Sequence, residues 1–187
     1  MAAKPKYKIA IVVGSLRKDS LNRRVARSIC AFTADRLDCT LVEIGDLPLY
    51  NQDHESEPPE SVTRFRQQIA AADGVLFCTP EYNRGIPGVL KNAIDVGSRP
   101  YGKSSFNGKP TGIIANSPGA LGGVSAAKHL QNVLPGIAGP IMQQPEVYLS
   151  AVGDAFNDKG ELIKEPLQKV LQQYVDAFAA FIDRHHK

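Results

Sequence analysis

The stretch Lys8–Asn22 reads KIAIVVGSLRKDSLN and carries the strongest signal for the fold. Its apolar run, residues 9–13, is continuous rather than alternating, as expected for a strand buried on both faces of a parallel sheet. Apolar side chains then recur with helical spacing behind Ser20, a candidate helix cap, at Leu21, Val25, Ile29 and Phe32. A buried strand, a loop and an amphipathic helix in this order predict a βα unit of an α/β fold.

The same arrangement recurs along the chain. Five β-like runs, whose starts lie 31, 35, 36 and 35 residues apart, are Ile9–Val13, Thr40–Ile44, Val75–Thr79, Thr111–Ala115 and Glu146–Ser150. This spacing fits a strand plus a crossover helix, so we predict five βα units around one parallel sheet.

Further helical segments are predicted from the spacing of apolar residues. They cover Val62–Ala72, with Ser61 as the candidate cap, Leu90–Val96, and Leu167–Ile182. No linker interrupts the chain, and Asn51–Glu60 is interpreted as a surface loop inside the fold. The sequence therefore predicts one three-layer α/β domain that spans residues 1–187.

Composition and charge restrict the function. With 43% hydrophobic and 22% charged residues, the chain has the composition of a globular protein. The net charge is only +3, but residues 1–40 hold nine Lys and Arg against three acids, so an anionic partner is expected at that end. Nucleic acid is not an expected partner, because no long basic run is present.

The cysteines and the apolar runs bear on the compartment. Cys30, Cys39 and Cys78 show no C-x-x-C spacing, which argues against a disulfide framework or a zinc site and favours a reducing compartment. Met1–Lys8 has no leader-like apolar region, and no run approaches the roughly 18 apolar residues of a membrane span. We expect a cytoplasmic protein with no membrane partner and no bound metal.

Three polar loops are expected on one edge of the sheet. Ligands of open parallel sheets bind beyond the carboxyl ends of the strands, where the strand order reverses. In a sheet of order 2-1-3-4-5 the reversal lies between the first and third strands. The loops that would face a ligand are Gly14–Asn22 (GSLRKDSLN), Pro80–Pro87 (PEYNRGIP) and Asn116–Gly123 (NSPGALGG).

The first loop has the chemistry of a monophosphate site. It leads into a helix N-terminus, whose free N–H groups and positive dipole end favour an anion. Ser15 and Ser20 supply hydroxyls, Asn22 an amide, and Arg17 a fork of donors that matches phosphate oxygens. The alternative is an ordinary turn with a serine cap and a solvated Arg17. The loop is not G-x-G-x-x-G, which disfavours a dinucleotide laid across it.

The other two loops are less specific. Backbone groups of the second loop, around Tyr82, could recognise the edge of a flat heterocycle, with the Tyr82 ring beside it. The alternative is a plain turn closed by Pro80 and Gly85. Glycines in the third loop would let its backbone approach a ligand closely, and the alternative there is simple flexibility.

The first two loops together resemble a known family. The pairing of G-S-L-R-x-x-S-x-N with P-E-Y-N-x-x-x-P-x-x-L-K-N-A-I-D is similar to the NADPH-dependent FMN reductase family, and more narrowly to its bacterial quinone, chromate and azo-dye reductase branch. The resemblance implies a flavodoxin-like fold and tightly held FMN. It also implies hydride transfer from NADPH or NADH to FMN, and onward to quinones, chromate, azo dyes or free flavin.

Site residues follow from the same resemblance. It assigns to FMN binding Ser15, Arg17, Ser20, Leu21, Asn22, Pro80, Glu81, Tyr82, Asn83, Ser117 and Gly119. No catalytic side chain is implied, because the flavin carries the chemistry. The family commonly has two serines or threonines where this chain has Asn116–Ser117, followed by a flexible residue where this chain has Pro118.

Two further expectations concern anions and self-association. Arg84, Arg99 and Lys103 could border the flavin and grip the 2′-phosphate of NADPH or steer anionic acceptors; solvated charges or cross-subunit ion pairs are the alternative. The apolar residues near Ile86–Val96 exceed what one helix face needs, and the resemblance implies dimers or tetramers. We therefore expect a homodimer or homotetramer.

Other functions remain to be separated from this one. A flavodoxin-type electron carrier without turnover of its own is the main alternative, although such carriers are usually acidic. A module that binds another phosphorylated ligand is a second. Gly97–Ser104 matches the Walker A pattern, but a helix-like segment precedes it where a strand is required, which disfavours an ATPase. Cys78 is interpreted as a core residue rather than a nucleophile.

Overall fold

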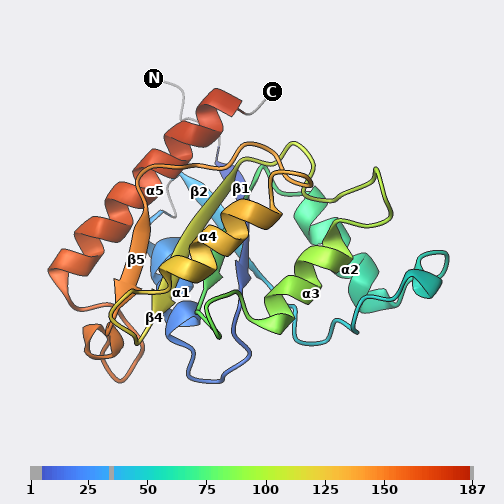
Figure 1. Cartoon of the computed structure of the whole chain (residues 1–187). Coiled ribbons are helices and arrows are strands. Elements are labelled where there is room, and N and C mark those ends of the chain that lie inside the picture. The colour runs from blue at the N-terminus through green and yellow to red at the C-terminus, as the bar shows by residue number, and fades with distance from the viewer. Residues whose placement is uncertain (1–5, 34–35, 186–187) are drawn as a thin grey trace.

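A computed structural model describes residues 6–33 and 36–185. Five parallel strands form one sheet in the order β2-β1-β3-β4-β5 (Figure 1). The strands are β1 (Tyr7–Val13), β2 (Leu37–Val42), β3 (Gly74–Thr79), β4 (Thr111–Ser117) and β5 (Val147–Ser150). The predicted strand order 2-1-3-4-5 is confirmed, and its reversal lies between β1 and β3.

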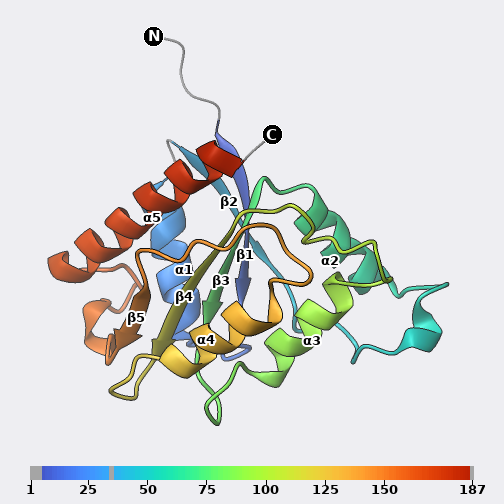
Figure 2. The same cartoon turned by 45° about the horizontal axis from the view of Figure 1, so that its top comes forward.

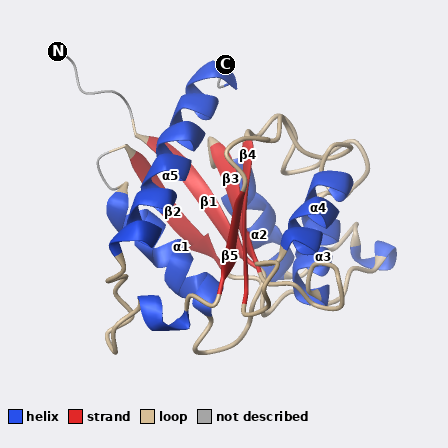
Figure 3. Ribbon diagram, turned by 60° about the vertical axis from the view of Figure 1, so that its left-hand side comes forward, coloured by secondary structure: helices blue, strands red, loops and turns tan. Residues whose placement is uncertain are grey.

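Helices cover both faces of the sheet. They are α1 (Leu21–Phe32), α2 (Glu60–Ala70), α3 (Gly88–Gly97), α4 (Val124–Val133) and α5 (Glu165–His185), with short 3₁₀ turns at Gln52–His54 and Gly153–Ala155. Helices α1 and α5 lie on one face, and α2, α3 and α4 lie on the other (Figures 2 and 3). This is the predicted three-layer arrangement.

The apolar run of β1 is continuous because both of its faces are buried. Ile9, Ile11 and Val13 pack into the core that includes α1 and α5. Ala10 and Val12 pack into the core that includes α2, α3 and α4. Since side chains alternate along a strand, a sheet covered on both sides needs apolar residues at every position.

Several predicted boundaries differ from the structure. Strand β2 occupies Leu37–Val42 rather than Thr40–Ile44. Helix α2 begins at Glu60 behind Pro59, which has no side-chain hydrogen bond to the helix, so the expected cap at Ser61 is wrong. Proline presets an extended residue from which a helix can start at once, and this places Ser61 inside the first turn.

A buried hydroxyl joins α5 to the middle of the sheet. The backbone N–H of Ile113, in β4, donates to the Tyr174 hydroxyl at 2.6 Å, and Tyr174 is 1% exposed. A Cβ on Gly112 would lie 2.7 Å from that same oxygen, so a larger residue would push the ring away. The Tyr174 hydroxyl is therefore the acceptor for a backbone N–H group that is buried away from solvent.

We expect Tyr174→Phe to destabilise the protein. The change leaves the Ile113 N–H buried without its acceptor, at a cost of about 1–3 kcal/mol and a fall in melting temperature of about 2–12 °C. Calorimetry measures the shift, with Tyr101→Phe as the control because Tyr101 is 90% exposed. Equal melting temperatures for the two variants would contradict the role of this hydrogen bond.

Candidate functional site

The first loop lies against the end of β3. The Gly14 N–H donates to the Cys78 carbonyl at 2.8 Å, which extends the β1–β3 pairing into the loop. A Cβ on Gly14 would lie 2.9 Å from Leu90 Cδ2 and 3.2 Å from Thr79 Oγ1. Glycine is thus required at this close approach between the first loop, β3 and α3.

Side-chain hydrogen bonds join the first loop to the third. The Asn22 amide donates from Nδ2 to the Asn116 carbonyl at 3.0 Å. Asn22 lies in the first turn of α1, whereas Asn116 lies near the end of β4. The third loop is held in turn by β5, because the Ser150 hydroxyl donates to the Gly119 carbonyl at 2.8 Å.

Glu81 joins the second loop to the third. Its Oε2 accepts from the backbone N–H groups of Ser125 at 2.9 Å and Ala126 at 3.3 Å, in the first turn of α4. The carboxylate thus caps a helix whose own N-cap, Gly123, has no side chain to do so. The predicted convergence of the three loops on one edge of the sheet is found.

The first loop offers hydrogen-bond donors at this edge that suit an anion. Ser20 is the N-cap of α1 and its hydroxyl accepts from Arg23 N–H at 3.2 Å. The earlier N–H groups of that turn, those of Leu21 and Asn22, have no partner within a helix. The first turn of α1 contains no acidic residue, and Arg17 beside it is exposed. The arrangement favours a phosphate group.

The second loop is a tight hairpin turn. Tyr82 and Gly85 exchange both backbone hydrogen bonds at 2.9 Å. Between them Asn83 and Arg84 have φ values of 49° and 64°, the pattern of a type I′ turn. A positive φ is unusual for arginine, and such backbone outliers concentrate at ligand sites.

His129, on α4, supports this hairpin from outside the motif. The Ile86 N–H donates to His129 Nδ1 at 3.3 Å, so this ring nitrogen acts as an acceptor toward the hairpin. A Cβ on Gly85 would lie 2.9 Å from the same nitrogen. The five predicted βα units include a helix after the fourth strand, but the sequence pattern gave it no residue range and gave His129 no role. The reason is that the buried stripe of α4 includes the small residues Ala126 and Ala127, so its periodicity is weak.

Backbone conformation and close packing require glycine at two positions of the third loop, whereas a third glycine there faces open space. Gly122 and Gly123 have φ values of 59° and 87°, and a Cβ on Gly122 would lie 2.8 Å from the Tyr148 carbonyl carbon. A Cβ on Gly119, by contrast, would face open space, with no atom beyond its chain neighbours within 4 Å. A hollow of about 280 Å³ opens here, lined by Glu81, Arg84, Ser117 and residues 119–123.

Buried polar atoms without partners lie between the first and third loops. They are Asn22 Oδ1 and both amide atoms of Asn116, Oδ1 and Nδ2. Both residues are nearly inaccessible, at 4% and 2% exposure. Since buried polar groups are almost always hydrogen-bonded, these atoms fit a ligand with a polar chain beyond its phosphate. A helix N-terminus suited to a phosphate, buried polar atoms and a hairpin of defined backbone conformation together fit FMN.

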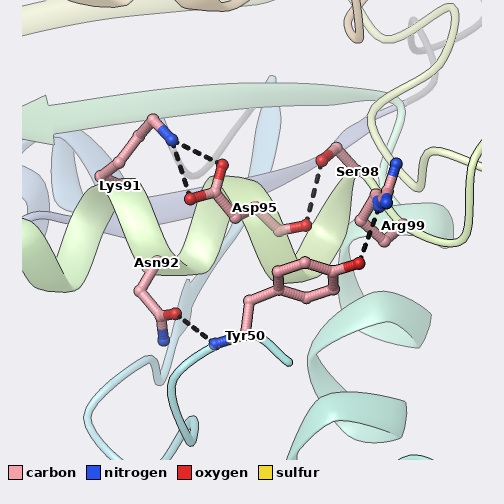
Figure 4. A network of polar contacts seen from close by, with 6 residues as sticks. All are labelled: Tyr50, Lys91, Asn92, Asp95, Ser98 and Arg99. Carbon is pink, nitrogen blue, oxygen red and sulfur yellow. Dashed lines mark hydrogen bonds and ion pairs between the residues drawn. The ribbon is translucent and has the colours of Figure 1, made fainter. Parts of the chain in front are cut away.

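The predicted cations do not form one cluster within the chain. Arg84 lies at the loop edge, 3.9 Å from Glu81 Oε1. Arg99 lies beyond the C-terminal end of α3, about 15 Å of helix away from that edge. There its Nε donates to the Tyr50 hydroxyl at 3.0 Å (Figure 4). The same nitrogen pairs with Glu55 Oε1 at 3.3 Å. Lys103 follows it in an exposed turn.

Other sequence signals are resolved by their surroundings. Leu90, Ala93, Ile94 and Val96 are buried in the chain's own core and Val89 is partly buried against it, so little apolar surface of this segment remains for self-association. Cys78 is also fully buried, and burial raises its pKa to about 12, as expected for a core thiol. The Walker A match begins at Gly97, the last residue of α3, and therefore lacks the strand that the motif requires.

We expect Glu81→Ala to loosen the second loop. Two N–H groups of α4 would lose their acceptor, at a cost of about 0.5–2 kcal/mol. Glu81→Gln is the matched control, because its amide oxygen can still accept and only the charge is lost, worth about 0.3–1 kcal/mol. Denaturant unfolding measures both variants, and an Ala variant as stable as the parent would contradict the capping role.

Comparisons with known proteins agree with this geometry. Residues 7–154 match the model of the NADPH-dependent FMN reductase family. A quinone reductase of Pseudomonas putida is 51% identical over 94% of this chain and 95% of its own length. A 2-hydroxy-1,4-benzoquinone reductase of a Burkholderia species is 45% identical over 94% of this chain and 96% of its own length. Among solved structures, the chain is similar to FerB, a flavoenzyme NAD(P)H:acceptor oxidoreductase from Paracoccus denitrificans. The two structures superpose with a TM-score of 0.92 over 97% of this chain and 100% of FerB, and their sequences are 42% identical.

Proposed function

Since the chain belongs to the NADPH-dependent FMN reductase family and is an NAD(P)H-dependent flavin oxidoreductase, we propose that quinones are its electron acceptors. Two of its relatives are named for quinone and hydroxybenzoquinone reduction. Chromate, azo dyes and free flavin are proposed as further acceptors, on the resemblance of the loop motifs alone.

The observation that carries the proposed site is the set of unpartnered buried atoms beside the α1 N-terminus. We assign the phosphate to Ser15, Arg17, Ser20, Leu21 and Asn22, which lie in the first loop and the first turn of α1. Asn22 and Asn116 would bind the polar chain. Bound FMN supplies hydride and electron transfer between nicotinamide and acceptor.

The rest of the pocket orients the flavin ring. We propose that the isoalloxazine lies along Pro80, Glu81, Tyr82 and Asn83, whose backbone the hairpin holds. Ser117 and Gly119 would form the third wall, beside the hollow. No side chain has to supply or remove a proton for hydride transfer, so substitutions here change binding and geometry rather than delete a chemical step.

Turnover separates the enzyme from an electron carrier. We expect the purified holoprotein to oxidise NADPH or NADH steadily when a benzoquinone is added, with no partner reductase present. The absorbance of reduced nicotinamide follows the reaction, and protein stripped of flavin is the control. A flavodoxin-type carrier would show no turnover, and that result would overturn the proposal. Replacing the quinone by chromate, an azo dye or free FMN tests the other acceptors.

Self-association and location are proposed on separate grounds. Apolar side chains remain exposed on all three loops, namely Leu16 (53%), Tyr82 (52%) and Leu121 (56%). We propose that a second copy covers this surface in a homodimer or homotetramer; a monomeric mass in light scattering would overturn it.

No helix in residues 6–33 and 36–185 is long and apolar enough to cross a membrane. A cytoplasmic location for this single flavin-binding domain is proposed from the resemblance and the cysteine pattern.

The anion proposal is tested by a matched pair of arginines. We expect Arg84→Ala to lower kcat/KM for NADPH up to about fivefold more than for NADH, because an exposed charge contributes about 0–1 kcal/mol. Arg99→Ala is the control, since Arg99 is held by Tyr50 and Glu55. A selective loss for NADPH in the Arg99 variant would instead support the sequence-based assignment of Arg99, with contact across a subunit interface.

A further inference from the structure

Two thiols lie side by side at the opposite edge of the sheet from the loops. Cys30 is in the last turn of α1, and Cys39 is in β2, where it pairs with Ile9 near the start of β1. Both side chains are partly exposed. A helix that follows a strand runs back toward the amino edge, so this pair is remote from the loop motifs and the proposed function does not use it.

The contacts around the pair bring the two cysteine side chains close to each other. Thr33 Oγ1 lies 3.9 Å from Cys39 Sγ, and Thr33 is three residues after Cys30, a spacing that puts both on one helix face. The Cys30 and Cys39 side chains also interact with each other, and this interaction is the largest influence on the pKa of each thiol. Both pack against the same apolar cluster. Two thiols brought close by a helix and a neighbouring strand are candidates for a disulfide, which forms where their Cα atoms lie within about 7 Å.

The two thiols differ in reactivity. The interaction with Cys30 lowers the pKa of Cys39; burial opposes this shift, and the contact with Thr33 adds to it. The interaction with Cys39, together with burial, raises the pKa of Cys30. Since the thiolate is the nucleophile, Cys39 is the thiol that attacks an oxidant first, and Cys30 is placed to attack the oxidised product.

We propose that Cys30 and Cys39 form a reversible redox pair, which hydrogen peroxide converts into an intramolecular disulfide. The Cys39 thiolate attacks one peroxide oxygen, the O–O bond breaks, and hydroxide leaves to be protonated to water. Cys39 is then a sulfenic acid. The Cys30 sulfur, giving up its proton, attacks Cys39 Sγ; the S–S bond forms, the S–O bond breaks, and a second water leaves. Two thiols and one peroxide yield one disulfide and two waters.

A reducing compartment makes this pair a sensor rather than a structural bridge. Glutathione and thioredoxin keep cytoplasmic thiols reduced, so the bond would form under oxidative load and be reversed by dithiol reductants. It would join α1, whose first turn belongs to the proposed phosphate site, to β2. Cys78 is fully buried and takes no part.

Thiol counting tests the proposal on the whole protein. Reduced holoprotein, unfolded and alkylated with iodoacetamide, carries three labels, one for each cysteine. After brief treatment with hydrogen peroxide we expect one label, at Cys78, and after dithiothreitol three again. Trypsin cleaves at Arg36, between the two cysteines, so the disulfide appears as residues 28–36 joined to residues 37–64. Three labels after peroxide, or a crosslink between two chains, would overturn the proposal.

Variants separate the roles of the two thiols. Cys78→Ser is the matched control and still loses two labels on oxidation. In Cys30→Ser the sulfenic acid of Cys39 cannot be resolved, so dimedone should trap it. In Cys39→Ser the Cys30 thiol should remain unlabelled by dimedone at the same peroxide dose. Trapping at Cys30 but not at Cys39 would overturn the assigned order of attack.

Discussion

Removing FMN is expected to lower the melting temperature of the protein by about 5–11 °C, and added FMN, but not riboflavin, is expected to restore it. A ligand that binds only the folded state stabilises it by about 2.7 kcal/mol at a hundredfold excess over Kd. For a chain of this size each kcal/mol corresponds to about 2–4 °C. The comparison with riboflavin isolates the phosphate, because the two flavins share the ring and the polar chain.

We expect this stabilisation because FMN would supply hydrogen-bond partners to several buried polar groups at once. Asn22 Oδ1 and both amide atoms of Asn116 are buried without partners, and each such atom costs free energy until it is hydrogen-bonded. The Asn22 amide joins the first loop to the third, Glu81 joins the second loop to the start of α4, and Ser150 ties the third loop to β5. Differential scanning fluorimetry of stripped protein with each flavin measures the effect. Equal rescue by riboflavin would contradict the phosphate site.

The fold was predictable because it depends on periodicity and burial. The continuous apolar run at residues 9–13 requires a strand covered on both faces, and the structure covers it with α1 and α5 on one side and α2, α3 and α4 on the other. Ser20 was found as the α1 cap because its hydroxyl precedes a clear apolar stripe. A helix between the fourth and fifth strands was implied by the strand spacing, but the bounds of α4 were not predicted, because the alanines it buries give little contrast with its polar face.

The site was predictable only as far as local motifs reach. The two loops that carry motifs do lie together, but the contacts that fix them come from residues distant in sequence. Glu81 reaches the backbone of Ser125, and Ile86 reaches the ring of His129. Arg99 shows the opposite error: it is near the motif in sequence, yet a helix carries it to the far end of α3, beside Tyr50. Residues that are close in sequence lie close in space within a loop, but residues at the two ends of a helix do not.

The second large effect is expected from Arg17→Ala, which should weaken FMN binding about 10–150-fold and leave riboflavin binding unchanged. A hydrogen bond to a charged group is worth about 1.5–3 kcal/mol, and each 1.4 kcal/mol is tenfold in affinity. Arg17 is exposed at the rim of the first loop, so removing it should leave the fold intact. Its fork of donors can engage two phosphate oxygens at once, which a lysine cannot do.

Lys18→Ala is the matched control for charge alone. Lys18 is the next residue and is equally exposed, so it shares the general field of the loop without a proposed contact to the phosphate. Quenching of flavin fluorescence on titration of stripped protein gives both dissociation constants for both variants. If only the field mattered, the two variants would lose FMN affinity equally and raised salt would abolish both losses, because exposed charges are screened beyond about 10 Å at 0.1 M. The phosphate contact is assigned to the Arg17 guanidinium by three results together. Only the Arg17 variant loses affinity, it loses affinity for FMN but not for riboflavin, and the loss persists at raised salt.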